Sequence, residues 1–208
     1  VTIPNSVTSI GSYAFSDCTG LTSVTIGDGV TTIGEYAFYD DTSLTSVEIG
    51  ESVTNLGNYA FKGCTALTEI KYNATECADL NSNNYVFSSA GQRGKGIAVI
   101  IGANVKKIPA LLFYPYSSFS SYAPKIISLE FEEGSVCESI GEEAFYKCEY
   151  LRSVVLSNSI TSIGNRAFRD CIRLNKVEMG NSVTSIGSCA FYNCSSLKNI
   201  VLPNSVSY

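Results

Sequence analysis

The chain lacks histidine and tryptophan and has a single methionine among its 208 residues. Without histidine it has neither the commonest general base nor the commonest metal ligand, and a Ser-His-Asp triad is excluded. Charged residues make up only 16% of the chain, against about 25% in an average protein. The net charge of −5 excludes the basic surface that nucleic-acid binding requires. No apolar run approaches the roughly 18 residues of a membrane span.

What the chain has in abundance is self-similarity at a spacing of 23 residues. Of the eight intervals between the first residues of successive repeats, six are within two residues of 23, and the other two are 29 and 30 residues long. We therefore expect about nine stacked units of about 23 residues. The units open at Val1, Val24, Val47, Ile70, Val99, Leu129, Val154, Val177 and Ile200.

Each unit follows one physical plan, which the second unit illustrates. Val24 and Ile26 alternate with polar residues, as in a short strand with one buried face. A turn over residues 27–29 and a second short segment ending at Gly34 follow. The stretch around Ala37-Phe38 is too short for a stable helix, so we expect one helical or 3₁₀ turn. One unit cannot bury its apolar face alone, which predicts stacking at about the strand-pairing distance of 4.8 Å.

Aromatic residues and cysteines occupy fixed columns of this repeat. A column of phenylalanines predicts a buried spine, not an aromatic binding stripe; its members are Phe15, Phe38, Phe61, Phe87, Phe113, Phe145, Phe168 and Phe191. A second column predicts buried free thiols that donate weakly to turn carbonyls, with disulfides between neighbouring units and a metal site as alternatives; it holds Cys18, Cys64, Cys148, Cys171 and Cys194. Cys77, Cys137 and Cys189 lie off this column and are expected to be more exposed.

The repeat has the pattern Leu-x-x-Val-x-Ile-Pro-x-x-Val-x-x-Ile-Gly-x-x-Ala-Phe-x-x-Cys, carried by Leu21 to Cys64 and Leu151 to Cys194. It resembles the BspA-like leucine-rich repeat over essentially the whole chain, weakening only between about 73 and 128. The resemblance implies one mostly β solenoid domain over 1–208, with a parallel sheet on the concave face and short helical or 3₁₀ turns. Stretched, irregular units are expected at 73–98 and 114–128.

The same resemblance implies a surface or secreted protein of a bacterium or protist, of a kind often described as an adhesin for host matrix proteins or other cells. The expected location is therefore extracellular or on the cell surface. Because the chain begins and ends within a repeat, we expect it to be a piece of a longer protein.

Recognition is expected at positions that the repeat leaves free. The outward positions of successive strands include Glu48, Lys71, Ile100, Glu130, Val155 and Glu178. Glu48 and Lys71 are expected to pair across neighbouring strands. Ile100 and Val155 are apolar at positions that should face solvent, either as a contact surface or because branched residues suit strands.

The second candidate surface is the aromatic insertion at residues 113–124. Since Phe113 belongs to the phenylalanine column and Tyr116 to the cysteine column, the free candidates are Tyr114, Phe119 and Tyr122. Their tyrosine-serine composition is typical of adaptable binding loops, and the alternative is a lid packed on a disturbed core. A group of basic residues in the last third is expected to be a solvated face; it comprises Arg152, Arg166, Arg169, Arg173 and Lys176.

The sequence offers no constellation for catalysis. Paired carboxylates such as Glu132-Glu133 are chain neighbours, which face opposite ways in a strand, and a polysaccharide-lyase β-helix fits poorly with Ala-Phe turns in every unit. We therefore predict a non-enzymatic interaction or adhesion protein that binds a protein or other cell-surface macromolecule through the concave sheet and the insertion. The alternatives are an architectural spacer and a carbohydrate-binding module. No cofactor, metal, nucleic acid or membrane insertion is expected.

Overall fold

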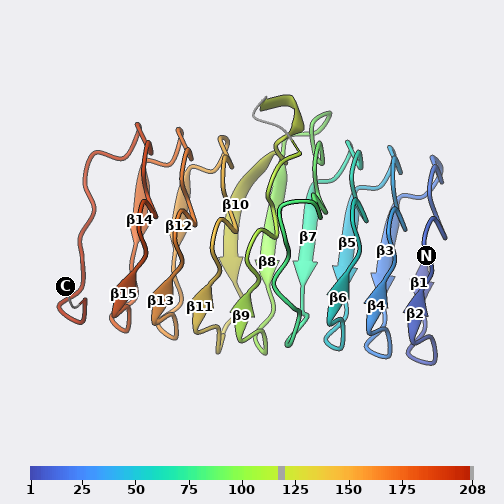
Figure 1. Ribbon diagram of the computed structural model, residues 1–208, viewed down its shortest axis with the longest axis horizontal. Helices are drawn as coiled ribbons and strands as arrows, with labels where there is room; N and C mark the ends of the chain where they lie inside the picture. The colour runs from blue at the N-terminus through green and yellow to red at the C-terminus, as the bar shows by residue number, and fades with distance from the viewer. Residues whose placement is uncertain (117–119, 207–208) are drawn as a thin grey trace.

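The computed structural model describes residues 1–116 and 120–206. Successive coils of the chain stack along one axis, with the N-terminus at one end and the C-terminal coil at the other (Figure 1). The main sheet has eight strands, and every neighbouring pair is parallel. In spatial order these strands are β1 (Thr2–Ile3), β3 (Ser23–Ile26), β5 (Ser46–Ile49), β7 (Glu69–Tyr72), β8 (Ile97–Ile101), β10 (Ile126–Phe131), β12 (Ser153–Val155) and β14 (Lys176–Glu178).

The register of the main sheet confirms the predicted period. The residues expected to open successive units lie directly beside one another, from Val24 through Val47 and onward to Val154 and Val177. The predicted ninth opening, Ile200, follows the last strand and lies in a segment without strand structure. Because equivalent residues of successive coils pair in parallel, the chain is a parallel β solenoid.

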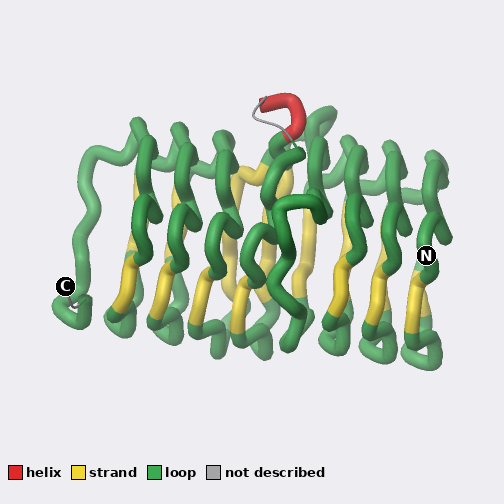
Figure 2. Tube along the Cα trace, in the orientation of Figure 1, coloured by secondary structure: helices red, strands yellow, loops and turns green. Residues whose placement is uncertain are grey.

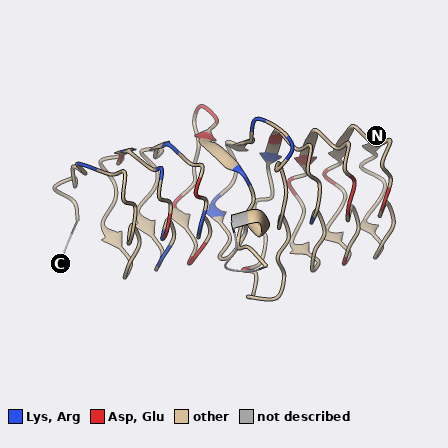
Figure 3. Cartoon of the chain, turned by 90° about the horizontal axis from the view of Figure 1, so that it is seen from above, with Lys and Arg blue, Asp and Glu red and all other residues tan. Residues whose placement is uncertain are grey.

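Two shorter parallel ladders form a second layer opposite the main sheet (Figure 3). The ladder in the first three coils contains β2 (Ser9–Ile10), β4 (Thr32–Ile33) and β6 (Asn55–Leu56). The ladder in the later coils contains β9 (Lys107–Ile108), β11 (Ser139–Ile140), β13 (Ser162–Ile163) and β15 (Ser185–Ile186). The two are separated where the stretched unit that follows β7 interrupts the repeat.

The core between the layers contains the predicted phenylalanine spine. Neighbouring rings along the column lie 5.0 to 5.4 Å apart between centroids. The six inner rings are fully buried, whereas Phe15 and Phe191, at the two ends of the column, are partly buried. The prediction that this column is core and not a binding stripe is confirmed.

The segment around each Ala-Phe pair is a series of overlapping β-turns instead of the expected helical or 3₁₀ turn. In the first coil the N–H groups of Ala14, Ser16 and Cys18 each bond to the carbonyl three residues earlier. The intervening N–H groups bond to the next coil, as from Phe15 to the Ala37 carbonyl at 2.8 Å. A helix would use all of these donors internally, so the stacking of coils favours turns. Among the described residues the only 3₁₀ segment is η1 (Ser120–Tyr122), the red element at the upper edge in Figure 2.

Four cysteines of the column, Cys64, Cys148, Cys171 and Cys194, are buried as predicted. The prediction is wrong for Cys18, which is exposed because it lies in the end coil of the stack. The Cys64, Cys171 and Cys194 thiols donate to phenylalanine carbonyls of the preceding coil at 3.1 to 3.2 Å, and all eight cysteines are free. Cys189 is exposed and Cys77 partly buried, as expected for positions off the column. The expectation for Cys137 is wrong, because it is fully buried. The register of Ser139 beside Lys107 and Ser162 places Cys137 in an inward valine and isoleucine column.

Within the described residues, no helix has both the length and the apolar character needed to cross a bilayer.

Candidate functional site

The outward residues of the main sheet form one row across the stack, which we call the sheet face. It is defined by Glu48, Lys71, Ile100, Glu130, Val155 and Glu178. Glu48 lies beside Lys71, Lys71 beside Ile100, and Ile100 beside Glu130. Val155 lies beside Glu178 in the last two strands. The parallel ladder thus brings six sequence-predicted candidates into one surface, because their positions in the repeat are equivalent.

A small charge network occupies the middle of the sheet face. The Lys71 ammonium lies 3.3 Å from the Glu48 carboxylate, which confirms the predicted pair, and 3.2 Å from that of Glu132. The second Glu132 oxygen accepts a hydrogen bond from the Ala103 N–H at 3.1 Å. That N–H and Lys71 lower the pKa of Glu132, while Glu132 and Glu48 raise the pKa of Lys71. These side chains are more than one third exposed, so the network fixes their orientation and adds little stability.

The rest of the sheet face combines apolar and acidic side chains. Val155 has 53% of its surface exposed although it lies within a strand, and Ile100 is partly exposed. Glu130 is exposed, and Glu178 forms an ion pair with Lys176. None of these side chains belongs to the buried core, so the fold leaves them available for contact.

The main sheet opens between two of its strands. Five residue pairs join β8 to β10, but only Leu129 and Val154 pair between β10 and β12. Beside this single pair lies a hollow of about 710 Å³, which we call the β10–β12 groove. Its walls include Glu130, Phe131, Glu132, Val155 and Leu156. Sequence reasoning missed this groove, although the two extra residues of this unit were a signal for it.

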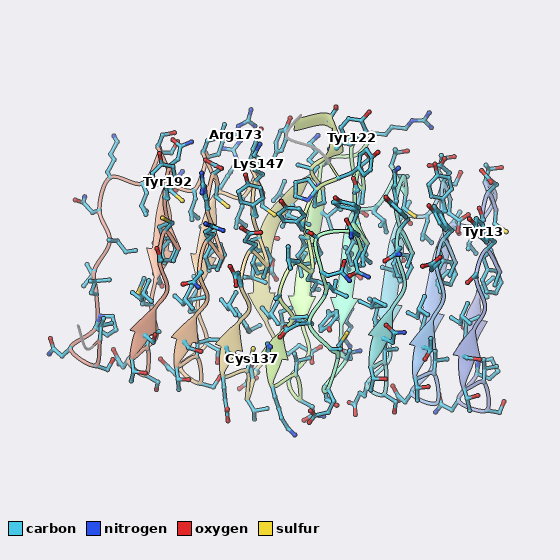
Figure 4. The ribbon with its side chains drawn as sticks, in the orientation of Figure 1. Tyr13, Tyr122, Cys137, Lys147, Arg173 and Tyr192 are labelled. Carbon is cyan, nitrogen blue, oxygen red and sulfur yellow. The ribbon has the colours of Figure 1, made fainter. Side chains whose placement is uncertain are left out.

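A ladder of stacked tyrosines follows the Ala-Phe turns, and we call it the tyrosine ridge. It comprises Tyr13, Tyr36, Tyr59, Tyr85, Tyr114 and Tyr146, with neighbouring ring centroids 4.8 to 6.2 Å apart. The predicted candidate Tyr114 is a member, and Tyr122 contacts the ridge through Tyr116. Figure 4 places Tyr122 at the upper edge of the coils, beside η1. The third candidate, Phe119, lies outside the described residues.

Tyr116 corrects the sequence prediction, because it does not fill the cysteine column. It is 48% exposed, and its ring and that of Tyr59 each lie 4.8 Å from the Lys62 ammonium. The physical reason is that the regular coil resumes only at Tyr122. The Tyr122 carbonyl accepts a hydrogen bond from the Ser89 N–H at 2.9 Å. The Ser88 carbonyl accepts the equivalent bond from the Gly63 N–H one coil earlier. Tyr116 therefore lies outside the regular coil path.

Four of the five basic residues of the last third have an individual partner; they are Arg166, Arg169, Arg173 and Lys176. Arg166 lies 3.1 Å from Glu143, and Arg173 lies 4.5 Å from the centre of the Tyr150 ring. Figure 4 shows Arg173 with Lys147 and Tyr192 toward the upper edge of the coils. Each contact satisfies one cation locally, in keeping with the expected solvated face.

The described residues show no metal centre, and burial makes two of the cysteine thiols weakly reactive. They contain no group of three histidine, cysteine or acidic side chains that could hold a metal ion. Burial raises the pKa of the Cys137 and Cys194 thiols to about 11 in each case. Thiols with such pKa values stay protonated at neutral pH and are poor nucleophiles.

Repeated coils, a parallel sheet and a phenylalanine spine together define a leucine-rich repeat solenoid. A family model described as a BspA type leucine-rich repeat region matches residues 1–120 and 115–208. The chain belongs to this BspA type leucine-rich repeat family.

Solved structures of bacterial leucine-rich repeat proteins also resemble the chain. A T. pallidum protein is 20% identical, with 96% of this chain and 78% of that one covered and a TM-score of 0.46. A leucine-rich cell surface protein of Faecalibacterium prausnitzii is 21% identical, with 96% and 72% covered and a TM-score of 0.34. A Eubacterium ventriosum protein is 20% identical, with 99% and 79% covered and a TM-score of 0.31. No curated protein sequence matches the chain.

Proposed function

We propose that this protein is an extracellular, non-enzymatic interaction protein that binds a macromolecular partner through the sheet face. The partner proposed is a host matrix protein or a protein on the surface of another cell. The observation that carries the proposal is the row of exposed outward side chains, including Ile100, Glu130 and Val155, held in register on one parallel sheet. The spine and the inward columns provide stability, which leaves this row free for recognition.

The sheet face suits an extended protein segment. Equivalent side chains recur on neighbouring strands at about 4.8 Å, so a partner that crosses the strands meets a different residue at each step. The row changes from the charged pair Glu48 and Lys71 to the apolar Ile100, and again from Glu130 to Val155 across the groove. Such a pattern can discriminate between partners through both charge and shape.

The tyrosine ridge favours a protein partner over a glycan. Sugars bind aromatic side chains by packing on the ring face, but the rings of Tyr13, Tyr36 and Tyr59 stack on one another at 4.8 to 4.9 Å. Tyr114 is likewise stacked on Tyr146, with their centroids 5.3 Å apart. The faces of these rings are thus largely covered, and their edges and hydroxyl groups remain for contact. The ridge therefore adds a second polar and aromatic surface, distinct from the sheet face.

The test uses three proteins: the unaltered chain, a sheet-face variant carrying Lys71→Ala and Ile100→Ser, and an insertion variant carrying Tyr114→Ala, Phe119→Ala and Tyr122→Ala. Each is measured against purified matrix proteins, whole cells and a glycan array, with urea unfolding as the control for stability. We expect the sheet-face variant to lose binding to a matrix protein or cell by about tenfold or more while it unfolds at a similar urea concentration.

The other outcomes separate the alternatives. Loss of binding in the insertion variant alone would move the binding surface to the insertion. Binding to glycans alone would support the carbohydrate-binding alternative. An unaltered chain that binds none of these targets would support a spacer.

A further inference from the structure

The β10–β12 groove is a local break in an otherwise regular sheet. Leu129 is followed by Cys137 after eight positions, whereas Val24 is followed by the equivalent Val30 after six. The two extra residues enlarge the turn after β10. In this turn the Ser135 N–H bonds to the Glu132 carbonyl, and Gly134 has a φ of +75°. On the other wall, the Leu156 N–H bonds to the Glu178 carbonyl of the next coil, so β12 keeps its regular pairing on that side. The longer turn thus separates the two walls, and the hollow of about 710 Å³ results.

The walls of the groove differ in chemistry. The β10 wall carries the carboxylates of Glu130 and Glu132, and among the described residues that line the groove none is lysine or arginine. Glu132 is held by Lys71 and the Ala103 N–H, whereas Glu130 is exposed. The β12 wall carries Val155, which is 53% exposed, and the lining also includes the partly buried ring of Phe131.

We propose that the β10–β12 groove binds an extended segment of a partner protein that carries a lysine or arginine next to an apolar residue. The cation lies against Glu130, and the apolar side chain packs on Val155. This inference rests on the proposed function, since it names the chemistry of the segment that the sheet face recognises. Charge complementarity selects this occupant, because Lys71 already pairs with Glu132, whereas Glu130 is an exposed carboxylate with no lysine or arginine among the described lining residues.

The remaining lining residues suit the main chain of such a segment. Ser128 and Ser153 line opposite walls of the groove, and their hydroxyl groups can donate to or accept from a peptide backbone. The hydroxyl groups of Ser157 and Ser159 bond to each other and to the Ser135 and Cys137 carbonyls. In an extended peptide, alternate side chains point the same way and recur about every 6.6 Å, so one cation and the residue beside it face different walls. Backbone contacts would give affinity, and the two unlike walls would select the sequence.

The experiment uses the full chain and two synthetic peptides of seven residues. Lysine and valine alternate in the first peptide, and glutamate replaces lysine in the second. Binding is measured by fluorescence anisotropy for the unaltered chain, for Glu130→Lys, and for Glu69→Lys. Glu69 is an exposed residue of the same sheet outside the groove, so this variant makes the same change in net charge.

We expect the lysine peptide to bind the unaltered chain and Glu69→Lys with similar affinity, and Glu130→Lys about tenfold more weakly. A Val155→Ser variant should also weaken binding, and the glutamate peptide should not bind. Equal weakening by Glu69→Lys and Glu130→Lys would overturn the inference, since only overall charge would then matter. Failure of the lysine peptide to bind would also overturn it. In that case a matrix protein whose binding still depends on Lys71 and Ile100 would leave the proposed function standing.

Discussion

Phe168 shows what a single residue contributes to this fold. Its ring is fully buried, 5.2 Å from Phe145 and 5.4 Å from Phe191 between centroids. Substitution Phe168→Ala would leave a cavity between two rings that the stacked coils cannot close. We expect a loss of about 3–5 kcal/mol in the free energy of unfolding, measured by urea denaturation.

The control for this prediction is Arg166→Ala, two positions earlier on the same turn. Arg166 is exposed and its ion pair with Glu143 is solvated, so its removal should have a much smaller effect. Equal and small effects of the two substitutions would show that the phenylalanine column does not stabilise the chain.

Asp41 is an unusual residue because it takes a cysteine position of the repeat. The side chain is fully buried; one carboxyl oxygen accepts the Cys18 N–H at 2.7 Å and the other has no hydrogen-bond partner. Burial, together with the carboxylates of Asp17 and Asp40, raises the pKa of Asp41 to about 6 against the opposing Cys18 N–H. The folded chain therefore holds this proton more tightly than the unfolded chain, whose carboxyl titrates near 3.9.

The sign of the resulting pH dependence follows from linkage. The stabilisation from a protonated Asp41 is fully present below about pH 4 and is lost as the pH rises through about 6. The Asp41→Asn variant keeps an oxygen that can accept the Cys18 N–H. We expect its free energy of unfolding to decline less between pH 4 and pH 7 than that of the unaltered chain. The difference should be roughly 2–3 kcal/mol in urea titrations at the two pH values. Parallel pH profiles of the two proteins would contradict it.

Two residues show where the sequence alone misleads. Cys137 was expected to be exposed but fills an inward column, because the two extra residues lie before it in the unit. Tyr116 was expected in a buried column but is exposed, because the regular coil resumes only at Tyr122. In both cases the repeat identifies the columns, but an insertion changes which residue enters them.

At the scale of the structural element, one glycine column controls how closely the coils approach. A Cβ added to Gly57 would lie 2.5 Å from backbone atoms of Glu35 and Gly34 in the preceding coil. A Cβ added to Gly11, the equivalent glycine of the first coil, would have no neighbour within 4 Å. We expect Gly57→Ala to lower the free energy of unfolding by about 1–3 kcal/mol, and Gly11→Ala to change it by less than about 0.5 kcal/mol.

Thermal and urea unfolding of the two glycine variants check this prediction. The substitution is the same, so differences in helix or coil propensity cancel to first order. Similar destabilisation of both variants would mean that the close backbone approach between coils is not the reason for glycine at this position.

The strands and the spine could be predicted because stacking forces equivalent residues into register. Val24 and Val47, for instance, pair as their repeat positions require. The turns could not be predicted, because residues such as Tyr13 and Asp17 have a φ of +59°, which local preference disfavours and which the hydrogen bonds to the next coil impose. The tyrosine ridge could not be predicted for a related reason. Tyr85 stacks on Tyr114, which occupies a different position of the repeat.

At the scale of the whole molecule, the solenoid separates its surfaces. The sheet face lies on the main sheet, and the tyrosine ridge follows the turns that connect the second layer back to the main sheet. Charge is also unevenly distributed along the stack, because the first basic side chain of the sequence is Lys62. The N-terminal coils therefore carry acidic but no basic side chains, as Figure 3 shows. The two ends of the stack and the two surfaces therefore differ in charge and in side-chain chemistry.

Carboxyl footprinting tests the central claim, that recognition takes place on the sheet face, most directly. Exposed carboxylates are labelled with a carbodiimide and an amine, with and without a bound matrix protein or lysine peptide, and quantified by mass spectrometry. We expect protection of Glu130 on the sheet face and unchanged labelling of Glu35 and Glu142, which are exposed beside the Ala-Phe turns. Protection of Glu35 and Glu142 with continued labelling of Glu130 would contradict the account.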